Sequence, residues 1–276
     1  MMFTTKELGY GITRIVGQGA VFMYLFEGND KALLLDTGLG VGNIKEFVNS
    51  ITNLPIEVYL THGHLDHAGG AYHFDKVHMS LLDKELFDSN SKEYRLHYVS
   101  LIKQITGVGE WFENDICEQK PVEIIDINDG EEIDLGGRTI TAISFPGHTH
   151  GSFGFYDSLS HYLVIGDCCD NSTFCFFPES TTINEYLSSL NHIKETWLPK
   201  TKELITSHDY DIVPWECFDN NIDCCERILS GKADGEAFEH INKDFDPTDV
   251  YWAYKGGEKR IDGKCGNVAY KLNKIY

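Results

Sequence analysis

The feature that most constrains this chain is a histidine-rich segment that directly follows an apolar run. Residues 56–62 read IEVYLTH, a β-branched and aromatic pattern that predicts a strand, and HGHLDH then occupies His62 to His67. Only 12 histidines occur in the 276 residues, and three of them fall within these six positions beside an aspartate. This concentration favours a metal site over a solvated loop.

The spacing within HGHLDH suggests how two ions would be bound. His62 and His64 lie two apart, so in extended backbone their side chains project to the same side and can hold one ion. Asp66 and His67 follow at the turn into a helix and can serve a second ion. Imidazole and carboxylate ligands without thiolate suit zinc, and they tolerate iron or manganese. We therefore expect two Zn²⁺ ions, with iron or manganese as alternatives.

Four ligands cannot complete two coordination spheres, so the hypothesis requires partners elsewhere in the chain. Three predicted strands end in such residues: SFPGHTHGS ends one at His148, HYLVIGDCC at Asp167 and ELITSHDYD at His208. A carboxylate placed between two histidine sets can bridge two cations through its two oxygens, and Asp167 holds that position.

The rest of the sequence alternates between strands and helices, without a repeat or a glycine-rich phosphate-binding motif. Residues 20–26 and 31–38 predict a hairpin, and the tail contains two further predicted strands, at 249–255 and 267–272. Helices are predicted at 41–52, 67–74, 81–90, 93–105, 182–197 and 215–231, and strands at 56–62, 76–80, within 122–148, and at 152–157, 161–167 and 203–208.

We expect a single domain over residues 1–276. The helical insertion around 81–118 is a candidate lid, and residues 211–276 form a C-terminal extension of helix and strands. The acidic blocks DKELFDSNSKE and NDGEEID are interpreted as solvated faces.

Charge and composition exclude several classes of partner. Forty-three acidic residues against 23 basic ones give a net charge of −20, which repels polyphosphate backbones and weighs against nucleic acid. There is no secretion signal and no run of about 18 apolar residues, so we expect a soluble cytoplasmic protein without a membrane segment. The eight cysteines show no CxxC spacing, which favours reduced thiols.

With these residues identified, the sequence resembles the metallo-β-lactamase fold superfamily over roughly residues 11–210. The resemblance implies an α+β fold, a four-layer αββα sandwich with the helical insertion at 81–118 and a dinuclear site at one edge of the two sheets. The motifs that carry it are DTG at Asp36 to Gly38, THGHLDH at Thr61 to His67, PGHTHGS at Pro146 to Ser152, GD at Gly166 and Asp167, and His208 after a strand.

The resemblance also implies which residue holds which ion. Asp36 would support the site loops by hydrogen bonding and would not bind metal. His150 lies at a variable position of its motif and is expected to be a non-ligand, as are the histidines at positions 73, 78, 97, 161, 192 and 240. The first ion would be bound by His62, His64 and His148, the second by Asp66, His67 and His208, and both by Asp167.

These ligands predict a hydrolase. Two divalent ions lower the pKa of a shared water toward about 7, and one can polarise the substrate oxygen. The expected reaction is attack by a metal-bridging hydroxide on a small-molecule ester, thioester or lactone, with Asp66 as the catalytic residue that orients the hydroxide and relays its proton. Cys168 and Cys169, next to Asp167, are a minor alternative as ligands.

Within the family the substrate stays open. β-Lactamases of this fold lack the bridging aspartate. Lactonases carry a tyrosine three residues after it, where this chain has Asp170. Glyoxalase II-like thioesterases share all seven ligands, but the tail shows no basic residues suited to a glutathione conjugate. The alternatives are a phosphodiesterase or RNase Z-like nuclease, an iron-dependent oxidoreductase, and a non-catalytic small-molecule binding protein.

Aromatic residues near the proposed site are candidates for contact with substrate. Phe174, Phe176 and Phe177 follow the bridging aspartate and would form an apolar wall or pack in the core. Trp111 and Tyr210 are weaker candidates. The expected partner is a small molecule, and homodimerisation is common in the family.

Overall fold

The computed structural model describes residues 2–106, 111–208, 212–239 and 248–276, with only the backbone described for residue 20 and for 104–106. These residues form two compact units. The first comprises Met1–Ile143 and Phe155–Ser160, and the second comprises Ser144–Gly154 and His161–Tyr276. The expected single domain over residues 1–276 stays a prediction.

The first unit is built on a seven-stranded sheet with strands in sequence order, antiparallel from β1 to β4 and parallel from β4 to β7. The predicted hairpin is confirmed as β3 and β4, whereas β1 and β2 were not predicted. The strands are β1 (Thr4–Gly9), β2 (Ile12–Val16), β3 (Phe22–Glu27), β4 (Ala32–Leu35), β5 (Ile56–Tyr59), β6 (Lys76–His78) and β7 (Glu123–Ile125).

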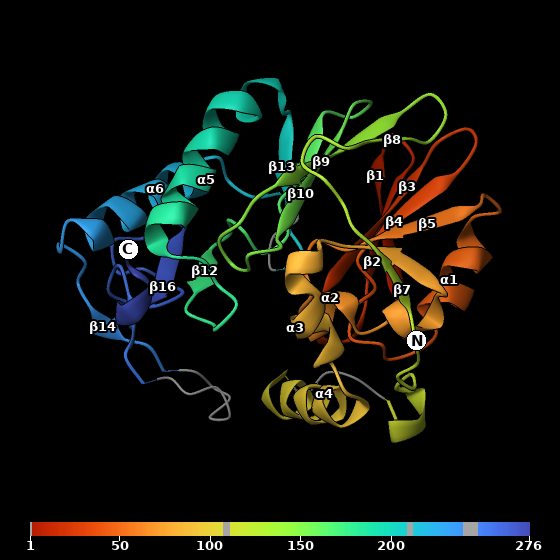
Figure 1. Cartoon of the computed structure of the whole chain (residues 1–276), viewed down its shortest axis with the longest axis horizontal. Helices are drawn as coiled ribbons and strands as arrows, with labels where there is room; N and C mark the ends of the chain where they lie inside the picture. Colours follow the sequence, from red (N-terminus) through yellow and green to blue (C-terminus); the bar gives the residue numbers. More distant parts are fainter. Residues whose placement is uncertain (1, 107–110, 209–211, 240–247) are drawn as a thin grey trace. The chain divides into compact units, whose positions relative to one another are not determined.

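Helix α1 (Ile44–Ile51) covers part of this sheet (Figure 1). It begins where the side chain of Asn43 accepts a hydrogen bond from the backbone N–H of Glu46, at 3.1 Å. Ile44 and Val48, one turn apart, are fully buried in the same apolar cluster as Leu34 and Val58 from the sheet. This packing fixes the strands that precede the histidine segment.

The helix expected at 67–74 is shorter than predicted and starts earlier. Helix α2 runs over Leu65–Ala68 and is followed by the 3-10 turn η2 (Ala71–His73). A Cβ atom on Gly70 would lie 2.3 Å from the carbonyl oxygen of Thr37, so this glycine lets two backbone segments meet. The backbone N–H of Thr37 also donates to the carbonyl oxygen of His67 at 2.7 Å, so the loop after β4 lies against α2.

The predicted insertion is helical, as expected. It contains η3 (Leu81–Asp83), α3 (Lys84–Asp88), α4 (Lys92–Thr106) and η4 (Glu113–Asp115). Arg95 of α4 is fully buried and donates hydrogen bonds to the carbonyl oxygens of Asn90, Gly69 and Cys117. The carbonyl of Gly69 belongs to the segment that follows α2, so α4 is tied to that segment.

A second sheet has the strand order β13-β11-β10-β9-β8, and the boundary between the two units falls within β9 and β10. These strands confirm the predictions made over 122–167 and 203–208. They are β8 (Glu132–Asp134), β9 (Thr139–Ser144), β10 (Phe153–Asp157), β11 (Tyr162–Val164) and β13 (Glu203–Ile205).

The second unit contains a four-stranded sheet of order β12-β16-β15-β14, in which β12 and β16 are parallel. Helices α5 and α6 pack side by side, and α6 contacts β16 (Figure 1). The two helices and the two tail strands were predicted, whereas β12 was not. The elements are β12 (Ser172–Cys175), α5 (Ile183–Thr196), η5 (Leu198–Lys200), α6 (Glu216–Leu229), β14 (Glu236–Ala237), β15 (Val250–Trp252), β16 (Asn267–Lys271) and η6 (Leu272–Lys274); η1 (Gln18–Ala20) belongs to the first unit.

The helices and the cysteines can be compared with what the sequence predicted. In the described part of the chain, no helix has the length and apolar character needed to span a bilayer. All eight cysteines lie among the described residues and are free thiols. The expected cytoplasmic location and homodimer stay predictions.

Candidate metal centre

The first unit gathers the four predicted ligands of the histidine segment. The chain leaves β5 at Tyr59, and the loop that follows leads into α2, whose preceding residue is His64 in extended conformation. The ring centroids of His62 and His64 lie 4.8 Å apart, and those of His62 and His67 lie 4.1 Å apart. An oxygen of Asp66 lies 3.8 Å from Nε2 of His67. Three imidazoles and a carboxylate therefore converge.

Asp36 organises this loop from behind. Its carboxylate accepts hydrogen bonds from the backbone N–H of Thr61 at 2.8 Å, from the Thr61 hydroxyl at 2.9 Å and from Nδ1 of His67 at 2.9 Å. Asp36 is 1% exposed and has a φ of 63°, in the left-handed region. Aspartate tolerates that region better than most residues because its short side chain can hydrogen bond locally.

These bonds fix which nitrogen of each buried ring can bind a metal. The Thr61 hydroxyl gives its proton to Asp36, so Nδ1 of His62, 3.0 Å from that hydroxyl, must be the donor in their hydrogen bond. Nδ1 of His67 likewise donates to Asp36. In both rings the lone pair is then on Nε2, the nitrogen that would coordinate a metal.

The glycine between the first two histidines is held by the insertion. The side chain of Asp83 accepts a hydrogen bond from the backbone N–H of Gly63 at 3.0 Å, and the side chain of Asn90 donates to the Gly63 carbonyl at 2.9 Å. Both supporting residues are 1% exposed. The interpretation of DKELFDSNSKE as a solvated face was wrong at these two positions, because they lie against the histidine loop.

The second unit brings together the three downstream ligands. Nε2 of His148 lies 3.7 Å from an oxygen of Asp167, and Nε2 of His208 lies 3.4 Å from the same oxygen. Nδ1 of His148 donates to the carbonyl oxygen of Phe174 at 2.8 Å, which leaves its lone pair on Nε2 as well. Asp167 follows β11 through Gly166, whose φ is 53°. The two histidines thus flank one carboxylate.

The described histidines that are not predicted to bind metal are exposed or contact other groups of the protein. His150 is exposed, Nε2 of His73 contacts the carbonyl of Gly42 at 3.1 Å, and the ring of His78 stacks on Tyr59. His97, His161 and His192 are exposed. His240 and Tyr210 lie outside the described residues.

Neither cysteine beside Asp167 has the environment of a metal ligand. The Cys168 thiol donates to the carbonyl of Phe145 at 3.3 Å. Burial raises the pKa of the Cys169 thiol well above its ordinary value, so the thiol form is favoured, whereas metals bind the thiolate.

The candidate aromatic residues differ in burial. Phe176 is 6% exposed and belongs to a buried cluster with Phe238 and Trp252, which fits the core interpretation. Phe174 and Phe177 are half-buried and pack against this cluster, and the ring of Phe177 meets that of His148 edge-on at 5.6 Å between centroids. Trp111 is half-buried in the first unit, under the amine of Lys103.

The side chains described above supply ring nitrogens and carboxylate oxygens that could hold a metal ion. The sequence profile of the metallo-β-lactamase superfamily matches residues 16–168. The chain therefore belongs to the metallo-β-lactamase superfamily, with the fold of that family, and the predicted hydrolase class is confirmed.

Among similar proteins, acyl-coenzyme A thioesterase MBLAC2 of Homo sapiens is 27% identical over 212 residues, which cover 70% of this chain and 76% of that protein. The beta-lactamase-like protein 2 homolog of Caenorhabditis elegans is 26% identical over 211 residues, covering 69% and 59% of the two chains. The solved metallo-beta-lactamase from Pontibacter korlensis matches with a TM-score of 0.58 and 14% identity, over 80% of this chain and 97% of that one. An archaeal superfamily protein from Sulfolobus tokodaii matches with a TM-score of 0.54 and 19% identity, over 79% and 87%.

Proposed function

We propose that this chain is a dinuclear, zinc-dependent hydrolase of small acyl thioesters. The observation that carries the proposal is the shared tautomer of His62, His67 and His148, each with Nδ1 engaged by the protein and its lone pair on Nε2. Neutral imidazoles fixed in this way are suited to bind a metal. His62, His64 and His148 would bind one ion, Asp66, His67 and His208 the other, and Asp167 both.

The donor set fits zinc and supplies no thiolate. Imidazole and carboxylate ligands are the combination used by catalytic zinc sites, which keep a position open for water or substrate. When bound, two such ions would lower the pKa of a water molecule toward about 7 and polarise a carbonyl oxygen. Iron or manganese stays an alternative, because the same ligands accept either.

In this proposal, residues of the chain orient the nucleophilic water, accept its proton and hold the imidazole rings in place. Asp66 is half-buried, and only one of its oxygens is needed as a ligand, so the other can orient a nucleophilic water and accept its proton. Asp36 and Thr61 keep His62 and His67 from rotating, since each ring is tied at Nδ1.

Two observations support a thioester as the substrate class. Relatives with 27% and 26% identity are named acyl-coenzyme A thioesterases. The half-buried ring of Phe177 stands beside His148 and offers an apolar surface to an acyl chain. The net charge of −20 opposes the phosphates of coenzyme A, so the proposal places recognition in the acyl and thioester groups.

The test compares bond types on one preparation. Release of free thiol would be followed for acyl-coenzyme A esters and for the matching N-acetylcysteamine thioesters, beside an aryl ester, a lactone and an aryl phosphodiester. Thioester cleavage that is lost with a chelator and restored by Zn²⁺ is the expected result. Cleavage of the phosphodiester alone would overturn the proposal and would favour the nuclease alternative.

Metal analysis provides the second arm. Wild-type protein should bind two zinc ions per chain, and the variants His62→Ala and His148→Ala should each lose at least one. Iron as the bound metal, together with oxygen consumption and no hydrolysis, would replace the hydrolase by the oxidoreductase alternative. Metal loading with tight small-molecule binding and no turnover would favour the binding-protein alternative.

A further inference from the structure

The loop that carries His148 is held along its backbone by the segment that follows β12. The hydroxyl of Ser180 donates to the carbonyl oxygen of His148 at 2.7 Å, and the backbone N–H of Thr181 donates to the carbonyl of Gly147 at 3.0 Å. In return, the N–H of His150 donates to the carbonyl of Glu179 at 2.9 Å. Residues 179–181 therefore fix the loop on both sides of His148.

Strand β12, just before this segment, fixes the orientation of the His148 ring. The carbonyl oxygen of Phe174 accepts the Nδ1 proton, and Phe174 lies in β12 directly opposite Ala269 of β16. Strand β16 belongs to the C-terminal extension, which lies beyond the family match over residues 16–168. One metal ligand is thus supported by a part of the chain that the family profile does not include.

Lys274, the last residue of η6, contacts the segment that holds the His148 loop. Its amine donates to the carbonyl oxygens of Pro178 at 3.0 Å and Ser180 at 2.6 Å. Both carbonyls lie in the segment that holds the His148 loop, and Ser180 itself contacts His148. A half-buried ammonium group that spans two carbonyls fixes their spacing, because each bond is charge-assisted.

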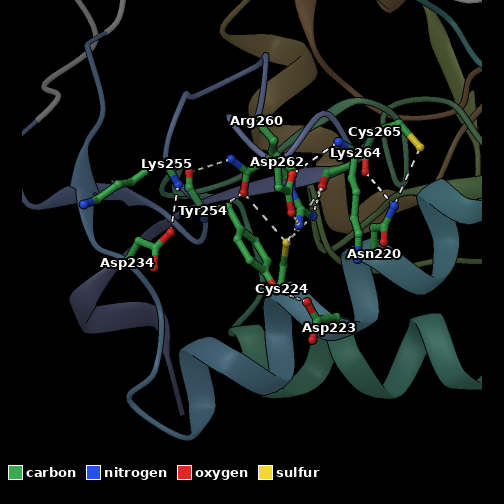
Figure 2. A network of polar contacts seen from close by, with 12 residues as sticks. Asn220, Asp223, Cys224, Asp234, Tyr254, Lys255, Arg260, Asp262, Lys264 and Cys265 are labelled. Atoms are coloured by element: carbon green, nitrogen blue, oxygen red, sulfur yellow. Dashed lines mark hydrogen bonds and ion pairs between the residues drawn. The ribbon is translucent and has the colours of Figure 1, made fainter.

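Polar contacts connect α6 with the segment that precedes β16. Figure 2 shows Tyr254 and Asp223 of α6, which form a hydrogen bond. The guanidinium carbon of Arg260 lies 3.6 Å from the centroid of the Tyr254 ring. Arg260 is 4% exposed and also donates to the carbonyl of Gly266, just before β16. These contacts join α6 to the segment just before β16, and β16 is joined to the preceding part of the second unit by its pairing with β12.

We propose that Lys274 is a positioning residue for the metal ligand His148, acting through residues 178–181. The proposal rests on the assignment of His148 as a ligand made above. Removing a hydrogen-bond partner of a metal ligand typically lowers metal affinity about 10- to 100-fold, and Lys274 acts one bond further out, so we expect about a tenfold loss.

The test measures metal binding and does not depend on turnover. Zinc would be titrated into metal-free protein against a chromophoric chelator to obtain two dissociation constants, for wild type and for Lys274→Met, Lys274→Arg and Ser180→Ala. Lys271→Met is the matched control, because it removes the same charge three residues earlier in the chain. His148→Ala identifies which of the two constants belongs to the ion bound by His148.

The expected result is specific to one ion. Lys274→Met and Ser180→Ala should weaken the constant that His148→Ala abolishes, leave the other within about twofold, and shift the visible spectrum of the Co²⁺-loaded protein. Lys274→Arg should restore wild-type binding, since arginine can donate to both carbonyls. Unfolding of the metal-free variants by denaturant separates a local effect from a general loss of stability.

Three outcomes would count against the proposal, and they differ from one another. Equal zinc affinity in wild type and Lys274→Met would overturn the positioning role and leave the hydrolase proposal intact. Equal weakening of both constants, together with a lowered free energy of unfolding, would show that Lys274 serves only the stability of the fold. A wild-type protein that binds no metal would overturn both proposals.

Discussion

The carboxylate of Asp36 and the imidazole of His67 lie 2.9 Å apart although 31 positions separate them in the sequence. The same carboxylate accepts both hydrogen bonds that Thr61 donates, and Thr61 in turn contacts His62. One side chain that is not among the predicted ligands therefore sets the orientation and the tautomer of two of them.

Replacing Asp36 with asparagine should weaken metal binding at both ions. Asparagine tolerates the left-handed backbone, but its NH₂ group cannot accept the proton of His67, so one tautomer is no longer enforced. We expect a loss of zinc affinity of about 10- to 100-fold, measured by competition with a chelator. Asp75→Asn, at an exposed side chain, is the control; equal affinity in Asp36→Asn and wild type would contradict the assignment.

Removing one partner of the buried ion pair between Arg138 and Asp157 should destabilise the first unit strongly. Two parallel hydrogen bonds of 3.0 and 2.7 Å join them, and both side chains are 1% exposed. Asp157→Asn leaves the guanidinium charge buried without its counter-ion, so we expect a loss of about 3–5 kcal/mol in the free energy of unfolding. The partly exposed pair of Lys31 and Glu57 is the control, and Glu57→Gln should change the free energy by less than about 1 kcal/mol. Similar losses of unfolding free energy in Asp157→Asn and Glu57→Gln would contradict the prediction that the buried pair matters more than the partly exposed one.

Stability of the metal-free protein should fall on mild acidification, in part through His78. Burial lowers the pKa of His78 below its ordinary value of 6.5, and the same cause acts on His73. Below pH 6.5 the unfolded chain binds more protons at these positions than the folded chain does, so the free energy of unfolding rises with pH through this window and decreases as pH falls.

The variant His78→Asn isolates this contribution. Between pH 7 and pH 5 it should lose less stability than wild type, as measured by denaturant unfolding of the metal-free protein. His192→Asn, at an exposed position, should follow the wild-type pH dependence. A steeper loss in His78→Asn than in wild type would show that the sign of the shift is wrong.

The two neighbouring phenylalanines Phe176 and Phe177 should respond differently to truncation. Phe176 is part of a buried cluster, so Phe176→Ala should lower the free energy of unfolding by about 3–5 kcal/mol. Phe177 is half-buried beside His148, and its loss should raise KM for long acyl thioesters by about tenfold, which corresponds to about 1.4 kcal/mol of apolar contact. kcat and the KM for short acyl groups should change little. An unchanged ratio of long-chain to short-chain KM would exclude Phe177 from the acyl surface.

The acidic surface should make turnover of charged substrates depend on salt. Between about 20 mM and 500 mM salt, screening weakens the repulsion between a chain of net charge −20 and the phosphates of coenzyme A. KM for acyl-coenzyme A should therefore fall as salt is added, whereas KM for the neutral N-acetylcysteamine thioester should stay constant. A KM for acyl-coenzyme A that rises with salt would reveal a basic binding surface despite the net charge.

The sequence pointed to the candidate metal ligands, which follow predicted strands closely. It did not point to the distant residues whose hydrogen bonds support them. His62, His64, Asp66 and His67 lie within six consecutive positions, and the periodicity of extended backbone suggested that His62 and His64 project to the same side. The hydrogen-bond partners Asp83 and Asn90 lie in an acidic block whose composition resembles any solvated surface, and only the tertiary structure shows that both are buried.

The secondary structure elements likewise differ in how far local sequence predicts them. The hairpin, the main helices and both tail strands have strong local patterns and were predicted. Strand β12 was not, because its residues STFC become a strand by pairing with β16, which lies more than ninety positions away. The support that Lys274 gives to the loop of His148 depends on that pairing, so no local pattern reveals it.

The left-handed backbone at Asp36 has a consequence for how this protein can change. At a φ of 63° a glycine would relieve backbone strain, yet it would remove the carboxylate that orients His62 and His67. The same change would leave the Thr61 N–H, the Thr61 hydroxyl and Nδ1 of His67 buried without their acceptor, which costs more stability than the relieved strain returns. A library screened for thermal tolerance and a library screened for turnover should therefore both retain the acid at this position.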